Sequence, residues 1–186
     1  MNDPTLILAS SSPRRQELLE QIGVPFKLLS VDIDESPLLG ESPAEFVIRM
    51  AAEKSQAGIV KSGGGLAVLG ADTIVVLGEE IMGKPVDETN AFDMLSQLSG
   101  RTHKVLSAVS LRSEQHQQML STSSVTFREI SPAEMRDYWL SGEPKDKAGG
   151  YAIQGFGAVF IEHIKGSYSG VMGLPLFETA QLLKQL

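Results

Sequence analysis

Apolar residues follow two patterns along this chain, short continuous runs and a spacing of three to four residues. Short runs bounded by turn residues predict strands, whereas the wider spacing predicts amphipathic helices. The runs predict strands at 6–9, 26–30, 66–77, 104–111, 119–128 and 159–164. The helical spacing predicts helices at 13–22, from 42 onward, at 88–98, from 131 onward and at 174–186. Because helices alternate with strands early and a strand hairpin follows, we expect an α/β fold with a mixed, twisted sheet flanked by helices.

Two identical Ser-Pro-Ala-Glu segments, at 42–45 and 131–134, mark the starts of two helices. In such a segment the serine caps the helix, the glutamate binds the N–H of the cap, and the proline suits the first turn. We interpret the identity of the two segments as local cap chemistry rather than as an internal repeat.

The apolar run at 66–77 is interrupted by Gly70, Ala71, Asp72 and Thr73. The interruption predicts that the carboxylate of Asp72 emerges at a strand end or a bulge, where α/β enzymes place working groups. The other interpretation is a turn aspartate that caps its own backbone. The pattern leaves both interpretations open.

The connection from the first strand to the first helix has the sequence Ser10-Ser-Ser-Pro-Arg14-Arg15. Proline suits the first helical position and a serine before it suits the cap. A helix start leaves backbone N–H groups free and carries partial positive charge, to which the two arginines add fixed charge. The segment therefore predicts a phosphate-binding corner.

The composition is that of a globular protein. Hydrophobic residues make up 42% of the 186 residues and charged residues 21%, so residues 1–186 suffice for a single domain, in one body or in two lobes around a cleft. No apolar run approaches the ~20 residues of a membrane span, and Asn2, Asp3 and Pro4 lack the pattern of a secretory signal. The absence of cysteine excludes a disulfide scaffold, a thiol nucleophile and a cysteine zinc site. A cytoplasmic location is the simplest expectation.

The net charge of −7 argues against nucleic acid as a partner, because a nucleic-acid footprint needs a basic face. It is compatible with a small phosphorylated ligand, since a few cations such as Lys54 and Lys84 can make one pocket positive. Asp32, Asp34 and Glu35 form an acidic cluster that could bind Mg²⁺ or Mn²⁺ through oxygen ligands. The other interpretation of the cluster is a solvated acidic loop. The three histidines have no metal-ligand spacing.

Six parts of the chain, in order, resemble the Maf family of nucleoside triphosphate pyrophosphatases. They are 8–15, 70–75, 83–87, 98–103, 143–149 with 151–155, and 166–168 with 173–176. One such motif would be a weak signal, but six in the same order over nearly the whole chain are specific.

The resemblance implies a fold like that of the inosine triphosphatases, with a central substrate cleft. It also implies hydrolysis of a nucleoside triphosphate to the monophosphate and pyrophosphate with a divalent metal cation, Mg²⁺ or Mn²⁺. Asp72 matches the catalytic acid–base residue of the family, which could also bind the metal, and Glu35 matches an acidic position assigned to metal or water. The phosphate-site positions of the family match Ser10, Arg14, Arg15, Lys54 and Lys84.

Four positions bear on the substrate within the family. The branch that acts on dTTP and UTP carries Arg, Thr, Lys and Gln, which match Arg14, Thr73, Lys147 and Gln154. The resemblance thus implies a house-cleaning hydrolase for pyrimidine nucleotides, including modified ones, with no nucleic-acid or membrane partner. It also suggests a homodimer. The alternatives are the 7-methyl-GTP branch and a nucleotide-binding regulator of cell division.

Overall fold

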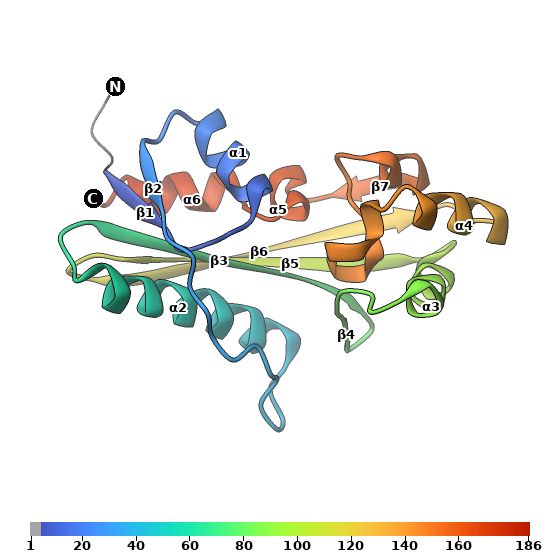
Figure 1. Cartoon of the computed structure of the whole chain (residues 1–186), viewed down its shortest axis with the longest axis horizontal. Helices are drawn as coiled ribbons and strands as arrows, with labels where there is room; N and C mark the ends of the chain where they lie inside the picture. The colour runs from blue at the N-terminus through green and yellow to red at the C-terminus, as the bar shows by residue number, and fades with distance from the viewer. Residues whose placement is uncertain (1–4) are drawn as a thin grey trace.

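The computed structural model describes residues 5–186, and Asn2, Asp3 and Pro4, on which the expectation about a secretory signal rests, lie outside them. A long twisted sheet has α2 on one face and α1, α5 and α6 on the other (Figure 1). The strands are β1 (Leu6–Leu8), β2 (Phe26–Leu28), β3 (Ala67–Leu77), β4 (Glu80–Met82), β5 (Thr102–Arg112), β6 (His116–Phe127) and β7 (Ile161–Lys165). The helices are α1 (Pro13–Gln21), α2 (Pro43–Ser62), α3 (Glu88–Leu98), α4 (Pro132–Leu140), α5 (Tyr168–Met172) and α6 (Leu176–Leu183).

The sheet is mixed, with the order β2-β1-β3-β5-β6-β7, and β4 forms a hairpin with β3. β1 runs parallel to both of its neighbours, whereas the other pairings are antiparallel. The prediction of a mixed α/β fold with a twisted, helix-flanked sheet is therefore confirmed. Within residues 5–186, no helix combines the length and the apolar character that crossing a membrane requires.

Both predicted capping boxes are formed. The side chain of Ser42 accepts a hydrogen bond from the Glu45 N–H, and Glu45 binds the N–H of Ser42 in return. Ser131 and Glu134 make the same pair of bonds at the start of α4. These helix starts are thus fixed by contacts that span only three residues.

The prediction of a break at Gly70–Thr73 is wrong, because β3 runs without interruption from Ala67 to Leu77. Asp72 lies opposite Ala108 of β5, in the middle of a regular ladder and at neither a strand end nor a bulge. Two smaller expectations also differ. The strand expected at 159–164 begins at Ile161, after a short 3₁₀ helix at 156–160. The helix expected at 174–186 is α6, at 176–183, and a separate helix, α5, precedes it.

Glycine allows α2 to pack closely on β3. A Cβ atom at Gly70 would lie 2.4 Å from the backbone oxygen of Ala51 and 2.5 Å from the backbone nitrogen of Ser55. One turn further along α2, a Cβ at Gly58 would lie 2.6 Å from Cγ1 of Val68. Alternate residues of β3 face this helix, so the close approach places Lys54 of α2 beside the strand.

We predict that Gly70→Ala lowers the free energy of unfolding by about 1–3 kcal/mol, because the added methyl group overpacks the contact with α2. Denaturant unfolding measures this change. Gly83→Ala is the matched control, since a Cβ there would meet nothing within 4 Å. We expect the control to change stability by less than about 0.5 kcal/mol. Equal effects of the two substitutions would contradict the packing argument.

Candidate active site

A cleft of about 650 Å³ opens beside the middle of β3. On this edge of β3, β1 pairs only with residues 67–69 and β4 only with residues 75–77. Between them, residues 70–74 pair with β5 on one edge and have no strand partner on this edge in the part of the chain that the structure describes. Because β1 is parallel to β3, the chain that leaves β1 enters this gap beside Asp72. All the site residues predicted from the sequence line this cleft, namely Ser10, Arg14, Arg15, Glu35, Lys54, Asp72, Thr73, Lys84, Lys147 and Gln154.

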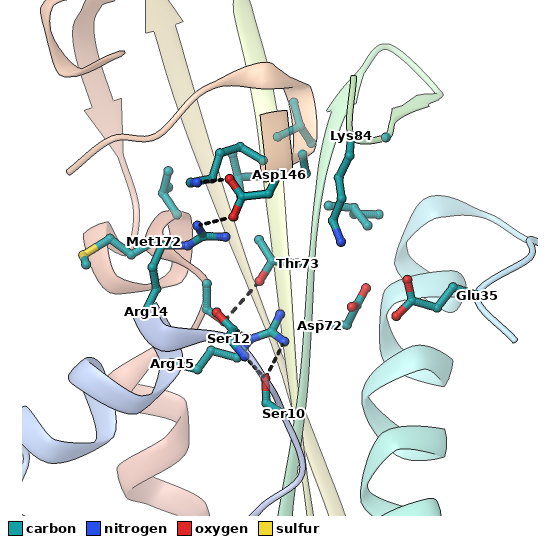
Figure 2. Close-up of a pocket in the computed structure, with 18 of the residues that line it drawn as sticks. Ser10, Ser12, Arg14, Arg15, Glu35, Asp72, Thr73, Lys84, Asp146 and Met172 are labelled. Carbon is teal, nitrogen blue, oxygen red and sulfur yellow. Dashed lines mark hydrogen bonds and ion pairs between the residues drawn. The ribbon is translucent and has the colours of Figure 1, made fainter. Parts of the chain in front are cut away.

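Lys54 joins two carboxylates in the cleft. Its Nζ lies 2.7 Å from Oδ1 of Asp72 and 2.7 Å from Oε1 of Glu35. The two carboxylates face each other, and Lys84 extends toward them from the loop after β4 (Figure 2). The side chains of Lys54 and Asp72 are only 12% and 13% exposed, so water screens their attraction less than at an open surface.

The pKa of Glu35 reflects this cluster of charges. Burial raises the pKa, but the hydrogen bond from Lys54 and the charges of Lys54, Lys84 and Arg15 outweigh burial and hold it below its usual value. Glu35 is therefore ionised at neutral pH, and its carboxylate oxygens can bind a cation.

The acidic cluster of the sequence is divided in the structure. Glu35 reaches the cleft, whereas the carboxylate of Asp34 accepts a hydrogen bond from the N–H of Ser36 at 2.9 Å, and Asp32 is exposed. No group of three or more His, Cys, Asp or Glu side chains among residues 5–186 has a metal-binding arrangement. Among residues 5–186, Asp72 of β3 is the acidic residue that shares the ammonium of Lys54 with Glu35.

The corner at the start of α1 is held by Arg15. Its Nε donates to the backbone oxygen of Gly173 at 2.9 Å, and NH1 donates to Oγ of Ser10 at 3.3 Å. Ser12 is the N-cap residue, but its side chain makes no capping hydrogen bond. It therefore leaves the free N–H groups of the first helical turn available to an anion.

The opposite side of the cleft holds the other predicted positions. NH1 of Arg14 lies 3.7 Å from Oδ2 of Asp146, and Lys147 forms an ion pair with the same carboxylate (Figure 2). Oγ1 of Thr73 shares a hydrogen bond of 2.7 Å with Oγ of Ser107. Asp146 thus contacts Arg14 and Lys147, two of the four positions that bear on the choice of substrate, although sequence reasoning did not single it out.

Residues that support the site were missed because their contacts are long-range. Asp146 stands beside Lys147 within a recognised segment, which was the one signal available for it. Ser107 offered no signal as one of two serines in an apolar strand, yet its hydroxyl donates to the backbone oxygen of Gly170 at 2.6 Å. This bond ties β5 to α5 behind Thr73.

The fold has a counterpart among solved structures, and a family model matches the chain. The Ham1 protein of Staphylococcus aureus has a similar structure, with a TM-score of 0.55 and 14% sequence identity over 97% of this chain and 96% of that one. The family model described as Maf-like protein matches residues 5–186, and the chain belongs to the Maf family.

Relatives within the family are considerably more similar. A protein of Methylococcus capsulatus named dTTP/UTP pyrophosphatase is 54% identical over 185 residues, which cover 99% of this chain and 92% of the relative. A protein of Alkalilimnicola ehrlichii with the same name is 52% identical over 98% of this chain and 93% of the relative. The resemblance inferred from the motifs is therefore confirmed at the level of the family.

His103 supports the wall of the cleft from behind. Its side chain is buried, and its Nε2 shares a hydrogen bond of 2.7 Å with the hydroxyl of Tyr151, which lines the cleft. Burial lowers the pKa of His103 to about 4 from 6.5. Between these two pH values the unfolded chain binds a proton that the folded protein does not.

We predict that the titration of His103 lowers the free energy of unfolding of the wild-type protein by about 3 kcal/mol as the pH falls from 6.5 to about 4. The loss arises because protonation of His103 is favoured only after unfolding. His103→Gln removes the titrating group, so its stability should fall less over the same range. Urea unfolding of both proteins across this range measures the difference. Parallel pH profiles would show that burial does not depress this pKa.

Proposed function

We propose that this protein is a nucleoside triphosphate pyrophosphatase that hydrolyses dTTP and UTP to the monophosphate and pyrophosphate. The observation that carries the proposal is the cleft in which Arg15, Lys54 and Lys84 lie around two facing carboxylates. The relatives named dTTP/UTP pyrophosphatase support this substrate, because the similarity extends over nearly all of this chain. Modified pyrimidine triphosphates would use the same cleft in a house-cleaning role.

The cations of the cleft suit a triphosphate, which carries about four negative charges at neutral pH. The guanidinium of Arg15 can bind two phosphate oxygens at once, whereas Lys54 and Lys84 act as point charges. The N–H groups at the start of α1 add partial positive charge at the same corner. We therefore place the phosphates between the first turn of α1 and the two lysines.

A divalent cation fits between Glu35 and Asp72. The ammonium of Lys54 already occupies a position within 2.7 Å of an oxygen of each carboxylate, which is a stand-in for a bound cation. Mg²⁺ is commonly held by one or two carboxylates together with substrate phosphates, so two oxygen donors suffice. When bound, the ion would neutralise the phosphate charge that the reaction shifts to the leaving group.

Asp72 is the proposed base. A water molecule attacks the α-phosphorus, the bond to the bridging oxygen breaks, and pyrophosphate leaves with the electron pair of that bond. Oδ1 of Asp72 contacts Lys54 in the structure and would contact the cation that takes its place, and this leaves Oδ2 to orient the water and accept its proton. Phosphoryl transfer depends mainly on positioning and charge neutralisation, which this arrangement provides.

The nucleobase is proposed to lie toward Thr73, Arg14, Lys147 and Gln154. A glutamine amide offers one donor and one acceptor group, as does the edge of uracil or thymine. The homodimer and the cytoplasmic location expected from the sequence stay predictions.

Turnover of a nucleotide panel tests the proposed function. The panel contains dTTP, UTP, CTP, GTP, 7-methyl-GTP and 5-methyl-UTP with Mg²⁺ or Mn²⁺, and pyrophosphate and orthophosphate are measured separately. We expect pyrophosphate to be released chiefly from dTTP and UTP. A preference for 7-methyl-GTP would assign the protein to the other branch. Tight binding without pyrophosphate release would favour a regulator.

We predict that Asp72→Asn lowers kcat for dTTP by about 10²- to 10⁴-fold while the protein stays folded, because the amide cannot accept the proton of the water. Steady-state kinetics and circular dichroism measure the two effects. Asp93→Asn is the control, since Asp93 is exposed on α3. Retained activity in Asp72→Asn would remove Asp72 from the reaction.

We predict that Lys54→Met strengthens Mn²⁺ binding to the nucleotide-free protein by about tenfold, because the ammonium no longer competes for the two carboxylates. The same substitution should lower turnover, since a phosphate-binding charge is lost. Titration calorimetry measures the affinity without reference to activity. Lys61→Met is the control on the same helix, because Lys61 binds the backbone oxygen of Ser30 instead. Unchanged or weaker Mn²⁺ binding in Lys54→Met would contradict the competition.

A further inference from the structure

A single carboxylate outside the predicted site holds the loop that carries Gln154. Oε1 of Glu143 accepts hydrogen bonds from the hydroxyl of Tyr138 at 2.6 Å and from the N–H of Gly157 at 3.0 Å. Oε2 accepts from the N–H of Phe156 at 2.8 Å. Glu143 therefore fixes the backbone two and three residues after Gln154.

Tyr138 fixes the backbone on the other side of the same residue. The N–H of Ala152 donates to its hydroxyl at 3.1 Å, so this hydroxyl links Ala152 to Glu143. The ring is 4% exposed and packs edge-on against Phe160 with the centroids 5.1 Å apart. Gln154 thus lies between two anchored positions, and no hydrogen bond of its own side chain holds it within the described chain.

Two glycines leave room for these anchors. A Cβ atom at Gly155 would lie 2.0 Å from Oε2 of Glu143, and one at Gly157 would lie 2.7 Å from the hydroxyl of Tyr138. The backbone of this loop therefore approaches Glu143 and Tyr138 as closely as its atoms allow. The approach explains why residues without side chains flank the exposed Phe156.

Glu143 is ionised at neutral pH, so both of its oxygens accept hydrogen bonds. Burial raises the pKa of Glu143, but the hydrogen bonds from Tyr138, Gly157 and Phe156 outweigh burial and lower it below the usual value. Hydrogen bonds to an ionised acceptor are the stronger kind, so the loop is held firmly.

We propose that Glu143 is a positioning residue for nucleobase selectivity, which acts by fixing the backbone on both sides of Gln154, directly and through Tyr138. The inference rests on the proposed function, since Gln154 is assigned there to the nucleobase. Glu143 does not line the cleft and touches neither the phosphates nor the reacting atoms. Its loss should therefore change recognition of the base and not the chemical step.

A double-mutant cycle tests this role with UTP and GTP as substrates. We expect Glu143→Gln to raise KM for UTP about tenfold and to change kcat by less than about twofold. Selectivity for UTP over GTP should fall by the same factor as KM rises. In the Gln154→Ala background, Glu143→Gln should have no further effect on KM, because the group that it positions is gone.

Matched variants separate positioning from general stability. Glu134→Gln makes the same chemical change at the cap of α4, away from the cleft, and should leave KM unchanged even where it lowers Tm. Tyr138→Phe removes one anchor while keeping the ring, so it should reproduce the selectivity loss in weaker form. It serves as the test if Glu143→Gln does not fold.

The outcomes distinguish this inference from the proposed function. If the factors by which Glu143→Gln and Gln154→Ala raise KM multiply in the double variant, the positioning role is overturned. A loss confined to kcat would also overturn it. Wild-type protein that releases no pyrophosphate from UTP or dTTP would overturn the proposed function and the inference together.

Discussion

The close approach of α2 to β3 is the constraint on which the site depends. Because Gly70 has no side chain, the helix backbone comes near enough for Lys54 to reach Asp72 from α2. The loop before α2 then brings Glu35 to the same ammonium. Partly buried ion pairs add little net stability, since the attraction is offset by lost hydration. The arrangement is therefore better explained by chemistry than by a contribution to the stability of the fold.

One strand separates the two ends of the proposed substrate. Asp72 and its alternate neighbours face α2, whereas Thr73 faces the opposite side and contacts Gly173 next to α5. Because β1 ends and β4 has not yet begun, both side chains lie at an open edge of the sheet. The cleft consequently passes around the edge of β3. Glu35, Asp72 and Lys54 lie on one side, and the base-selecting positions lie on the other.

The sequence predicted those features that depend on local contacts. The starts of α2 and α4 follow from capping boxes, and α3 has the predicted bounds. The break at Asp72 was wrong because periodicity does not distinguish a strand end from a strand whose polar residue faces a cleft. The family resemblance identified the residues that line the cleft, but not Glu143 or Asp146. Asp146 contacts Arg14, and Glu143 accepts hydrogen bonds from the backbone at 156 and 157. No spacing in the sequence reveals these contacts between separate segments.

We infer that the nucleotide binds across the open edge of β3. A crystal structure with Mg²⁺ and a dTTP analogue that has a non-hydrolysable link between the α- and β-phosphates tests it most directly. We expect the triphosphate between Arg15 and Lys84, the α-phosphorus next to Asp72, and thymine beside Gln154. A nucleotide bound elsewhere, or bound in the cleft with thymine at Lys54 and Lys84, would contradict this placement.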